Sequence, residues 1–128
     1  MEKKRILQIL EDLTKNKHPM NNLDREDYSY LENENEVVYF SHVSTTDEVI
    51  VRMKRVIDKM AEDLLGNGNE YERFIMIIEY NRANEMLMVE MASIYHFIEL
   101  CIKDKKLIWG LSENNDINHL RFTIIASK

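Results

Sequence analysis

The sequence predicts an α+β domain in which one four-stranded mixed sheet packs in two layers against two long helices. Three observations lead to this prediction. The 128 residues are enough for one compact domain but not for two. Hydrophobic residues make up 45% and charged residues 31%, values typical of a globular protein rather than a disordered chain. Helical and strand-like patterns also follow one another in the order α–α–β–α–β–α–β–β.

The first element is a one-faced helix over residues 2–16, which ends before Pro19 because the residue preceding a proline avoids the helical region. Residues 1–23 therefore form a leading helix and loop, and residues 24–128 the domain proper. An exposed apolar stripe is a liability, so this helix needs a cover, which a homodimer through the leading helix would supply. The stripe consists of Ile6, Ile9, Leu10 and Leu13.

The next three elements are a short helix, a strand and a long helix. Asp24 is a suitable N-cap for a helix that runs to about Leu31. Residues 36–43 are β-branched and aromatic, which predicts a strand. An apolar stripe over residues 49–65 predicts a helix of about five turns, with Gly66 as a left-handed C-cap.

The second half of the domain contributes three strands and one helix. The continuous apolar run at residues 74–78 predicts a central strand buried on both faces. Residues 85–102 predict a helix that is apolar nearly all round, so we expect it to be well buried. Strands are predicted at 106–110 and 120–125, with a polar turn at 113–116 between them.

Several reactive or adaptable side chains fall in this last helix. A methionine-rich surface can bind partners, but Met86, Met88 and Met91 are expected to form a plastic core under the sheet. The four histidines show no metal-binding spacing, and His96 is expected to be a hydrogen-bonded core histidine because it lies inside the helix predicted to be buried. Cys101 is the only cysteine, which excludes an internal disulfide, and we expect it to be a buried small hydrophobe.

Charge and glycine content exclude several classes of function. The net charge is −6 with no basic block, which argues against binding of nucleic acid or an anionic membrane. No apolar run approaches the ~18 residues of a membrane span, and the N-terminus lacks the apolar core of a signal peptide, so we expect a cytoplasmic location. The three glycines, Gly66, Gly68 and Gly110, cannot form a phosphate-binding loop, so no nucleotide cofactor is expected.

One segment combines several acids with an amide, namely Asn22-Leu23-Asp24-Arg25-Glu26-Asp27. Its plainest interpretation is a helix start, where the carboxylates cap the first turn and complement the helix dipole. The functional alternative is a pair of exposed carboxylates. Asp24 and Asp27 lie three residues apart, so on a first turn they point to nearly the same side. There they can orient a water or contact a hydrated Mg²⁺ held by the phosphates of another molecule.

At this segment the chain resembles the bacterial tubulin homologue FtsZ. The pattern Asn-x-Asp-x-x-Asp after a helix end, here Asn22, Asp24 and Asp27, is similar to the synergy loop of that family. The leading helix is similar to the end of its long central helix. The ending, Leu107-Ile108-Trp109-Gly110 followed by Arg121 to Ser127, is similar to its closing hairpin. Pro19 stands where the family has a glycine, and the GTP-binding domain has no counterpart.

The resemblance implies an FtsZ C-terminal-domain-like fold and a mechanism shared between molecules. Asp24 and Asp27 would be catalytic only in trans, on a nucleotide pocket supplied by a partner, with Asn22, Arg25 and Glu26 as partner-binding residues. GTP and Mg²⁺ would belong to that partner, and the chain would not be an enzyme on its own. The implied partner is an FtsZ-type filament subunit or a second copy, and the implied role is to cap or modulate filaments in cell division.

Two other functions stay open at this point. In the first, the chain is a structural or oligomerisation module that kept the fold but lost the filament interface. It is otherwise a small ligand-binding α+β domain, for which an apolar pocket lined by Met and Tyr side chains is expected.

Overall fold

The computed structural model describes residues 1–15, 23–46, 48–66 and 70–128. Its centre is one four-stranded sheet with the strand order β1-β4-β2-β3. Strand β4 is antiparallel to β1 and β2, whereas β2 and β3 are parallel, so the predicted mixed sheet is confirmed. The strands are β1 (Val37–Val43), β2 (Arg73–Tyr80), β3 (Lys106–Glu113) and β4 (Arg121–Ser127).

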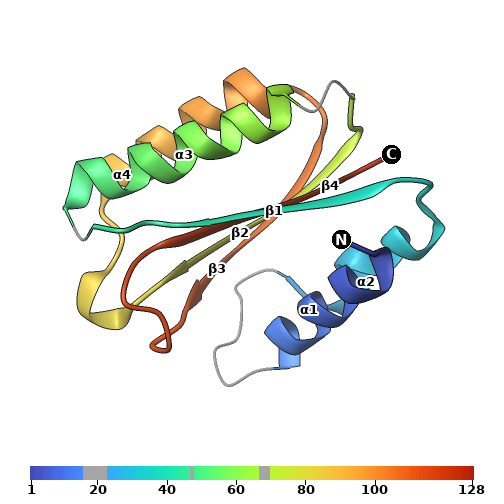
Figure 1. The fold of residues 1–128 in the computed structure, drawn as a ribbon, viewed down its shortest axis with the longest axis horizontal. Helices are drawn as coiled ribbons and strands as arrows, with labels where there is room; N and C mark the ends of the chain where they lie inside the picture. Colours follow the sequence, from blue (N-terminus) through green and yellow to red (C-terminus); the bar gives the residue numbers. More distant parts are fainter. Residues whose placement is uncertain (16–22, 47, 67–69) are drawn as a thin grey trace.

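Helices cover both faces of this sheet (Figure 1). One face carries the two predicted long helices, α3 (Val49–Gly66) and α4 (Met88–Phe97), the latter extended by the π-helical turn η3 (Ile98–Ile102). The other face carries α1 (Lys3–Lys15), α2 (Arg25–Tyr28) and the 3-10 turn η1 (Ser29–Asn33). A second short 3-10 turn, η2 (Arg82–Asn84), follows β2. The leading helix thus adds a layer to the predicted sheet and its two long helices.

Strand β2 is buried on both faces, as its continuous apolar run predicts. Six consecutive residues, from Phe74 to Glu79, are buried. Successive side chains of a strand point to opposite faces. Phe74, Met76 and Ile78 accordingly belong to the core under α3 and α4, while Ile75 and Ile77 belong to the core under α1.

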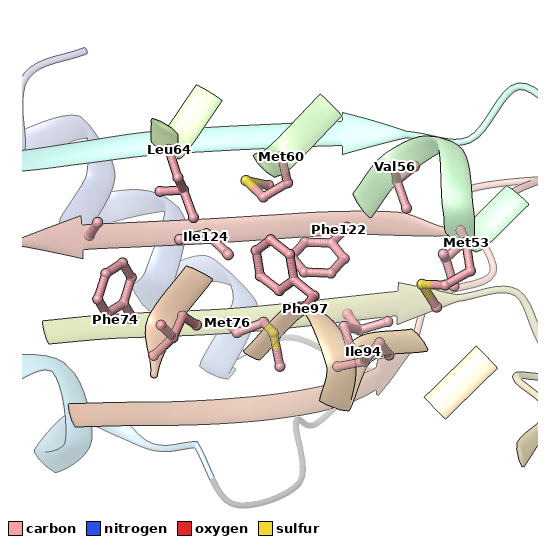
Figure 2. Close-up of a cluster of buried hydrophobic side chains, with 14 of the residues drawn as sticks. Met53, Val56, Met60, Leu64, Phe74, Met76, Ile94, Phe97, Phe122 and Ile124 are labelled. Carbon is pink, nitrogen blue, oxygen red and sulfur yellow. The ribbon is translucent and has the colours of Figure 1, made fainter. Parts of the chain in front are cut away.

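The larger core lies between the sheet and the α3–α4 layer (Figure 2). The apolar stripe predicted for α3 faces inward through Met53, Val56, Met60 and Leu64. Phe97 of α4 meets Phe122 of β4 edge-to-face, with ring centroids 5.4 Å apart and an interplanar angle of 81°, a favourable aromatic geometry. Gly66 differs from the prediction, since it is the last residue of α3 and not a left-handed residue after the helix.

Helix α1 is covered by the chain's own sheet. Ile6 and Leu10 are fully buried and share a core with Ile75, Ile77 and Ile125. The stripe that suggested a homodimer through the leading helix is therefore satisfied within one molecule. The predicted homodimer through the leading helix rested on an uncovered apolar stripe. That premise is wrong, because the second face of the sheet covers the apolar side of α1.

Helix α4 is less buried than its composition predicts. Only one stripe faces the sheet, because a helix lying on a sheet can bury only one side. Met88 is 86% exposed and Leu100 60% exposed, so the expectation of a well-buried helix is wrong. His96 is also exposed and is not a core histidine. Of the three methionines, Met88 is exposed, whereas the other two are half-buried against the core. The buried apolar stripe consists of Ile94, Phe97 and Ile102.

A buried ion pair joins the two long helices near their N-termini. Arg52 of α3 donates through Nε to Glu90 Oε2 (2.6 Å) and through Nη2 to Glu90 Oε1 (2.7 Å). The guanidinium also donates to the carbonyls of Asn84 and Glu85, and Glu90 accepts from the backbone N–H of Leu87. Both side chains are essentially inaccessible to solvent, so each charge depends on the other.

Removal of one member of this pair is expected to be costly. Glu90→Ala removes the carboxylate that neutralises the buried Arg52 guanidinium, and the free energy of unfolding should fall by about 3–5 kcal/mol in urea denaturation. The double variant Arg52→Met, Glu90→Leu should recover most of that loss, because it leaves no buried charge. Lys54→Ala, in the exposed Lys54–Asp58 pair of the same helix, should change stability by less than about 0.5 kcal/mol. If Glu90→Ala lowers the free energy of unfolding by less than about 0.5 kcal/mol, the fold does not depend on the Arg52–Glu90 pair.

The packing of α1 gives a second prediction. Leu10→Ala should lower the free energy of unfolding by about 2–5 kcal/mol, because the side chain is fully buried against the sheet. Lys4→Ala, at an exposed position of the same helix, is the control and should have little effect. Hydrogen exchange should show protected α1 amides in a monomeric sample. An α1 that exchanges freely, with Leu10→Ala neutral, would refute this arrangement.

Candidate functional site

The acidic turn at the start of α2 is the candidate site, and buried residues hold it on both sides. Leu23 precedes the helix and Tyr28 ends its first turn, and both belong to the core under α1. An apolar residue before the cap and another at the fourth helical position form a hydrophobic staple, which fixes the direction in which the chain enters the helix. The Tyr28 hydroxyl lies 3.3 Å from Thr14 Oγ1 of α1. The turn between these anchors therefore has a defined position on the domain.

Asp24 and Asp27 form a reciprocal capping box, which confirms Asp24 as the N-cap. The Asp24 Oδ1 atom accepts a hydrogen bond from the backbone N–H of Glu26 (3.0 Å). The Asp27 Oδ2 atom accepts one from the backbone N–H of Asp24 (2.9 Å). Two helix-terminal N–H groups are satisfied in this way. The predicted helix to Leu31 is realised as a single α-turn followed by the 3-10 turn η1.

The acids stay in contact with solvent while they cap. Asp24, Arg25 and Glu26 are exposed, and Asp27 is half-buried. The turn presents three carboxylates and one guanidinium, so it carries a net negative charge. Asn22, the amide assigned to the same site, lies outside the described residues. The structure thus brings four of the five predicted site residues together on one exposed turn.

Such a turn can accept hydrogen bonds or attract a hydrated cation held elsewhere. Within the described ranges, no group of three or more histidine, cysteine or carboxylate side chains is arranged to hold a metal ion. None of the helices in the described part of the chain is long and apolar enough to cross a membrane. What the turn offers is a pair of carboxylates within one helical turn, fixed by backbone hydrogen bonds.

Three comparisons with known proteins bear on this site. No protein-family model matches the chain, and no curated protein matches it. Among solved structures, an empty FtsZ dimer from M. jannaschii matches with a TM-score of 0.61 over 91% of this chain. The chain covers 34% of that protein's chain, at 10% sequence identity. The α+β fold of the FtsZ/tubulin type is therefore confirmed. An identity this low shows the fold alone, so the action of the acidic turn stays a prediction.

Sequence reasoning missed a polar cluster at the end of the sheet. Glu79 is buried next to Arg121 of the neighbouring strand, which donates to both of its carboxylate oxygens at 2.7 Å. Asn114 donates a third hydrogen bond, also at 2.7 Å. The hydrogen bonds from Arg121 to Glu79 raise the pKa of the Arg121 guanidinium above its ordinary value. In the sequence, this cluster was indicated only by a charged residue at the end of the apolar run of β2. That residue does not indicate which strand carries its partner.

The capping geometry predicts how the turn responds to substitution. Asp24→Ala should cost about 1 kcal/mol of unfolding free energy, because a helix-terminal N–H loses its acceptor. Asp24→Asn should be nearly neutral, since an amide oxygen caps about as well as a carboxylate. Thermal or urea unfolding measures both, with Arg25→Ala as the exposed control. An asparagine variant as unstable as the alanine variant would mean that the charge, and not the cap, stabilises this turn.

Proposed function

We propose that this chain docks through its acidic turn on the GTP-bearing face of an FtsZ-type subunit and modulates or caps filament assembly in bacterial cell division. The observation that carries the proposal is the exposed Asp24–Asp27 turn, held next to the leading helix on an FtsZ-type fold. The proposal places the chain in the cytoplasm, as its composition predicts.

The chemistry would be shared between two molecules. Asp24 and Asp27 would orient the attacking water or the Mg²⁺ hydration shell at a nucleotide that the partner holds. Arg25 and Glu26 are exposed beside them and would contact the rim of the partner's pocket. Asn22 would face the nucleotide. GTP and Mg²⁺ remain the partner's, so these residues would stimulate hydrolysis and not perform it alone.

Geometry suggests capping as the outcome. Head-to-tail filaments grow only when each subunit offers two different faces. These 128 residues contain a turn for one face and no glycine-rich loop for the other. A filament end that accepts this domain would gain no new nucleotide pocket from it. Growth should then stop at that end.

A structural or oligomerisation module is the second candidate, and the capping box favours it. The two acids already have a task in stabilising α2. A small ligand-binding domain receives less support. The apolar groove between α3 and α4 has no Met or Tyr side chain in its lining, whereas that hypothesis expects them.

The experiment separates the acid chemistry from the cap. The chain is mixed with an FtsZ and GTP, and polymer mass is followed by light scattering and GTP hydrolysis by phosphate release. Wild-type protein should shorten filaments at substoichiometric amounts and change the hydrolysis rate. The variant Asp24→Asn, Asp27→Asn keeps oxygen acceptors for the cap but loses both carboxylates. It should lose the effect while unfolding at nearly the wild-type temperature.

The matched control is Ser29→Ala, an exposed position just past the same turn, which should keep full activity toward the filament. If the folded wild-type chain changes neither assembly nor hydrolysis, the docking proposal fails. If the asparagine variant acts like the wild type, the chain docks without these carboxylates, and the role proposed for Asp24 and Asp27 is wrong.

A further inference from the structure

The outer surface of the α3–α4 layer carries apolar side chains that none of the described residues covers. On α4 and η3, Met88 is 86% exposed, Leu100 60%, Tyr95 53% and Val89 48%. Large apolar side chains gathered on one face of a soluble protein mark a site of association. This face lies on the opposite side of the sheet from the acidic turn (Figure 1), so its role is independent of the proposed function.

A groove runs between the two helices on this face, with a volume of about 610 Å³. Its base includes buried Phe97 and half-buried Ile57, and its exposed apolar walls include Val89 and Leu100. The Cys101 thiol also lies in the groove, and burial raises its pKa. The groove is therefore a largely apolar slot between the two helices.

We propose that this groove is a homodimer interface, in which the α3–α4 layers of two copies pack in antiparallel orientation about a two-fold axis. Charge is the first argument for a second copy. The chain carries a net charge of −6, which opposes self-association through most of its surface. The groove lining contains two formally charged side chains, Lys54 and Asp58. Their opposite charges cancel, so the groove has no net charge to repel a second copy.

The same two charges are self-complementary. Lys54 and Asp58 lie one helical turn apart on α3 and pair with each other at 3.2 Å, with both side chains largely exposed. Two antiparallel copies centred on this turn place Lys54 of each opposite Asp58 of the other. An isologous interface requires this kind of self-matching. Two intermolecular ion pairs would then frame the apolar contact.

The size of the face also suits a dimer. Helix α3 has 18 residues, which at 1.5 Å per residue gives a length of about 27 Å, and two helices side by side are about 20 Å wide. A standard interface buries about 800 Å² on each partner, which is of the order of such a face. The apolar ends also match, because an antiparallel arrangement brings Val89 of one copy toward Leu100 of the other.

Sedimentation velocity over a range of wild-type concentrations tests this proposal. A reversible monomer–dimer equilibrium is expected, and the variant Val89→Glu, Leu100→Glu should raise the dissociation constant at least about a hundredfold, because four carboxylates enter the apolar contact. Val43→Glu is the matched control. Val43 is an exposed apolar residue of β1. It lies on the α1 side of the sheet, as Val37 and Tyr39 do, because alternate residues of a strand share a face. The added carboxylate should therefore leave the dimer intact.

The ion pairs have their own test. Lys54→Glu should weaken the dimer about tenfold, since each copy then places two acids opposite two acids. Lys54→Glu combined with Asp58→Lys should restore nearly wild-type affinity, whereas a purely apolar contact would not respond to either change. Circular dichroism confirms folding of each variant. A wild-type chain that stays monomeric up to about 1 mM, or a Val89→Glu, Leu100→Glu variant that dimerises as tightly as wild type, overturns the proposal.

Discussion

The constraint on which the rest of the structure depends is the double-sided burial of strand β2. Its residues from Phe74 to Glu79 are all buried, so apolar elements have to cover both faces of the sheet. One cover is the α3–α4 layer, which the two crossovers from β1 to β2 and from β2 to β3 provide. The other cover is α1 with α2 and η1. The leading helix is therefore part of the fold, since without it Ile75 and Ile77 would face water.

Two charge clusters add specificity to this apolar frame, one of them fully buried and the other formed by buried Glu79 with half-buried Arg121. Arg52 and Glu90 fix the start of α3 against the start of α4, and Glu79 with Arg121 fixes the pairing of β2 with β4. Buried pairs of this kind add little net stability compared with apolar residues of equal volume. Their geometry is nevertheless demanding, because each charge is satisfied in only one register. We infer that they select one arrangement of helices and strands among several that would bury similar apolar area.

How far the sequence could predict the structure depends on whether the signal is local. The run at β2, the stripe of α3 and the Asp24 cap are local patterns, and each led to a correct prediction. Arg52 pairs with Glu90, which lies 38 residues away, and no local sequence pattern predicts this pair. The prediction that α4 is well buried was wrong for a related reason. A helix that is apolar all round predicts burial, but the sequence does not show that only one layer is available to cover it, and so Met88 remains exposed.

Both sheet faces are covered inside the molecule, and the two surfaces proposed to bind other molecules lie on opposite sides of the sheet. The acidic turn belongs to the α1–α2 layer, and the apolar groove belongs to the α3–α4 layer. A pair joined through the groove would therefore leave both acidic turns exposed and pointing away from the contact. Such a pair could hold two filament ends at once, and the second binding event would be intramolecular and favoured by effective concentration. In that case the oligomeric module and the filament-docking domain would be two properties of one molecule and not competing descriptions of it.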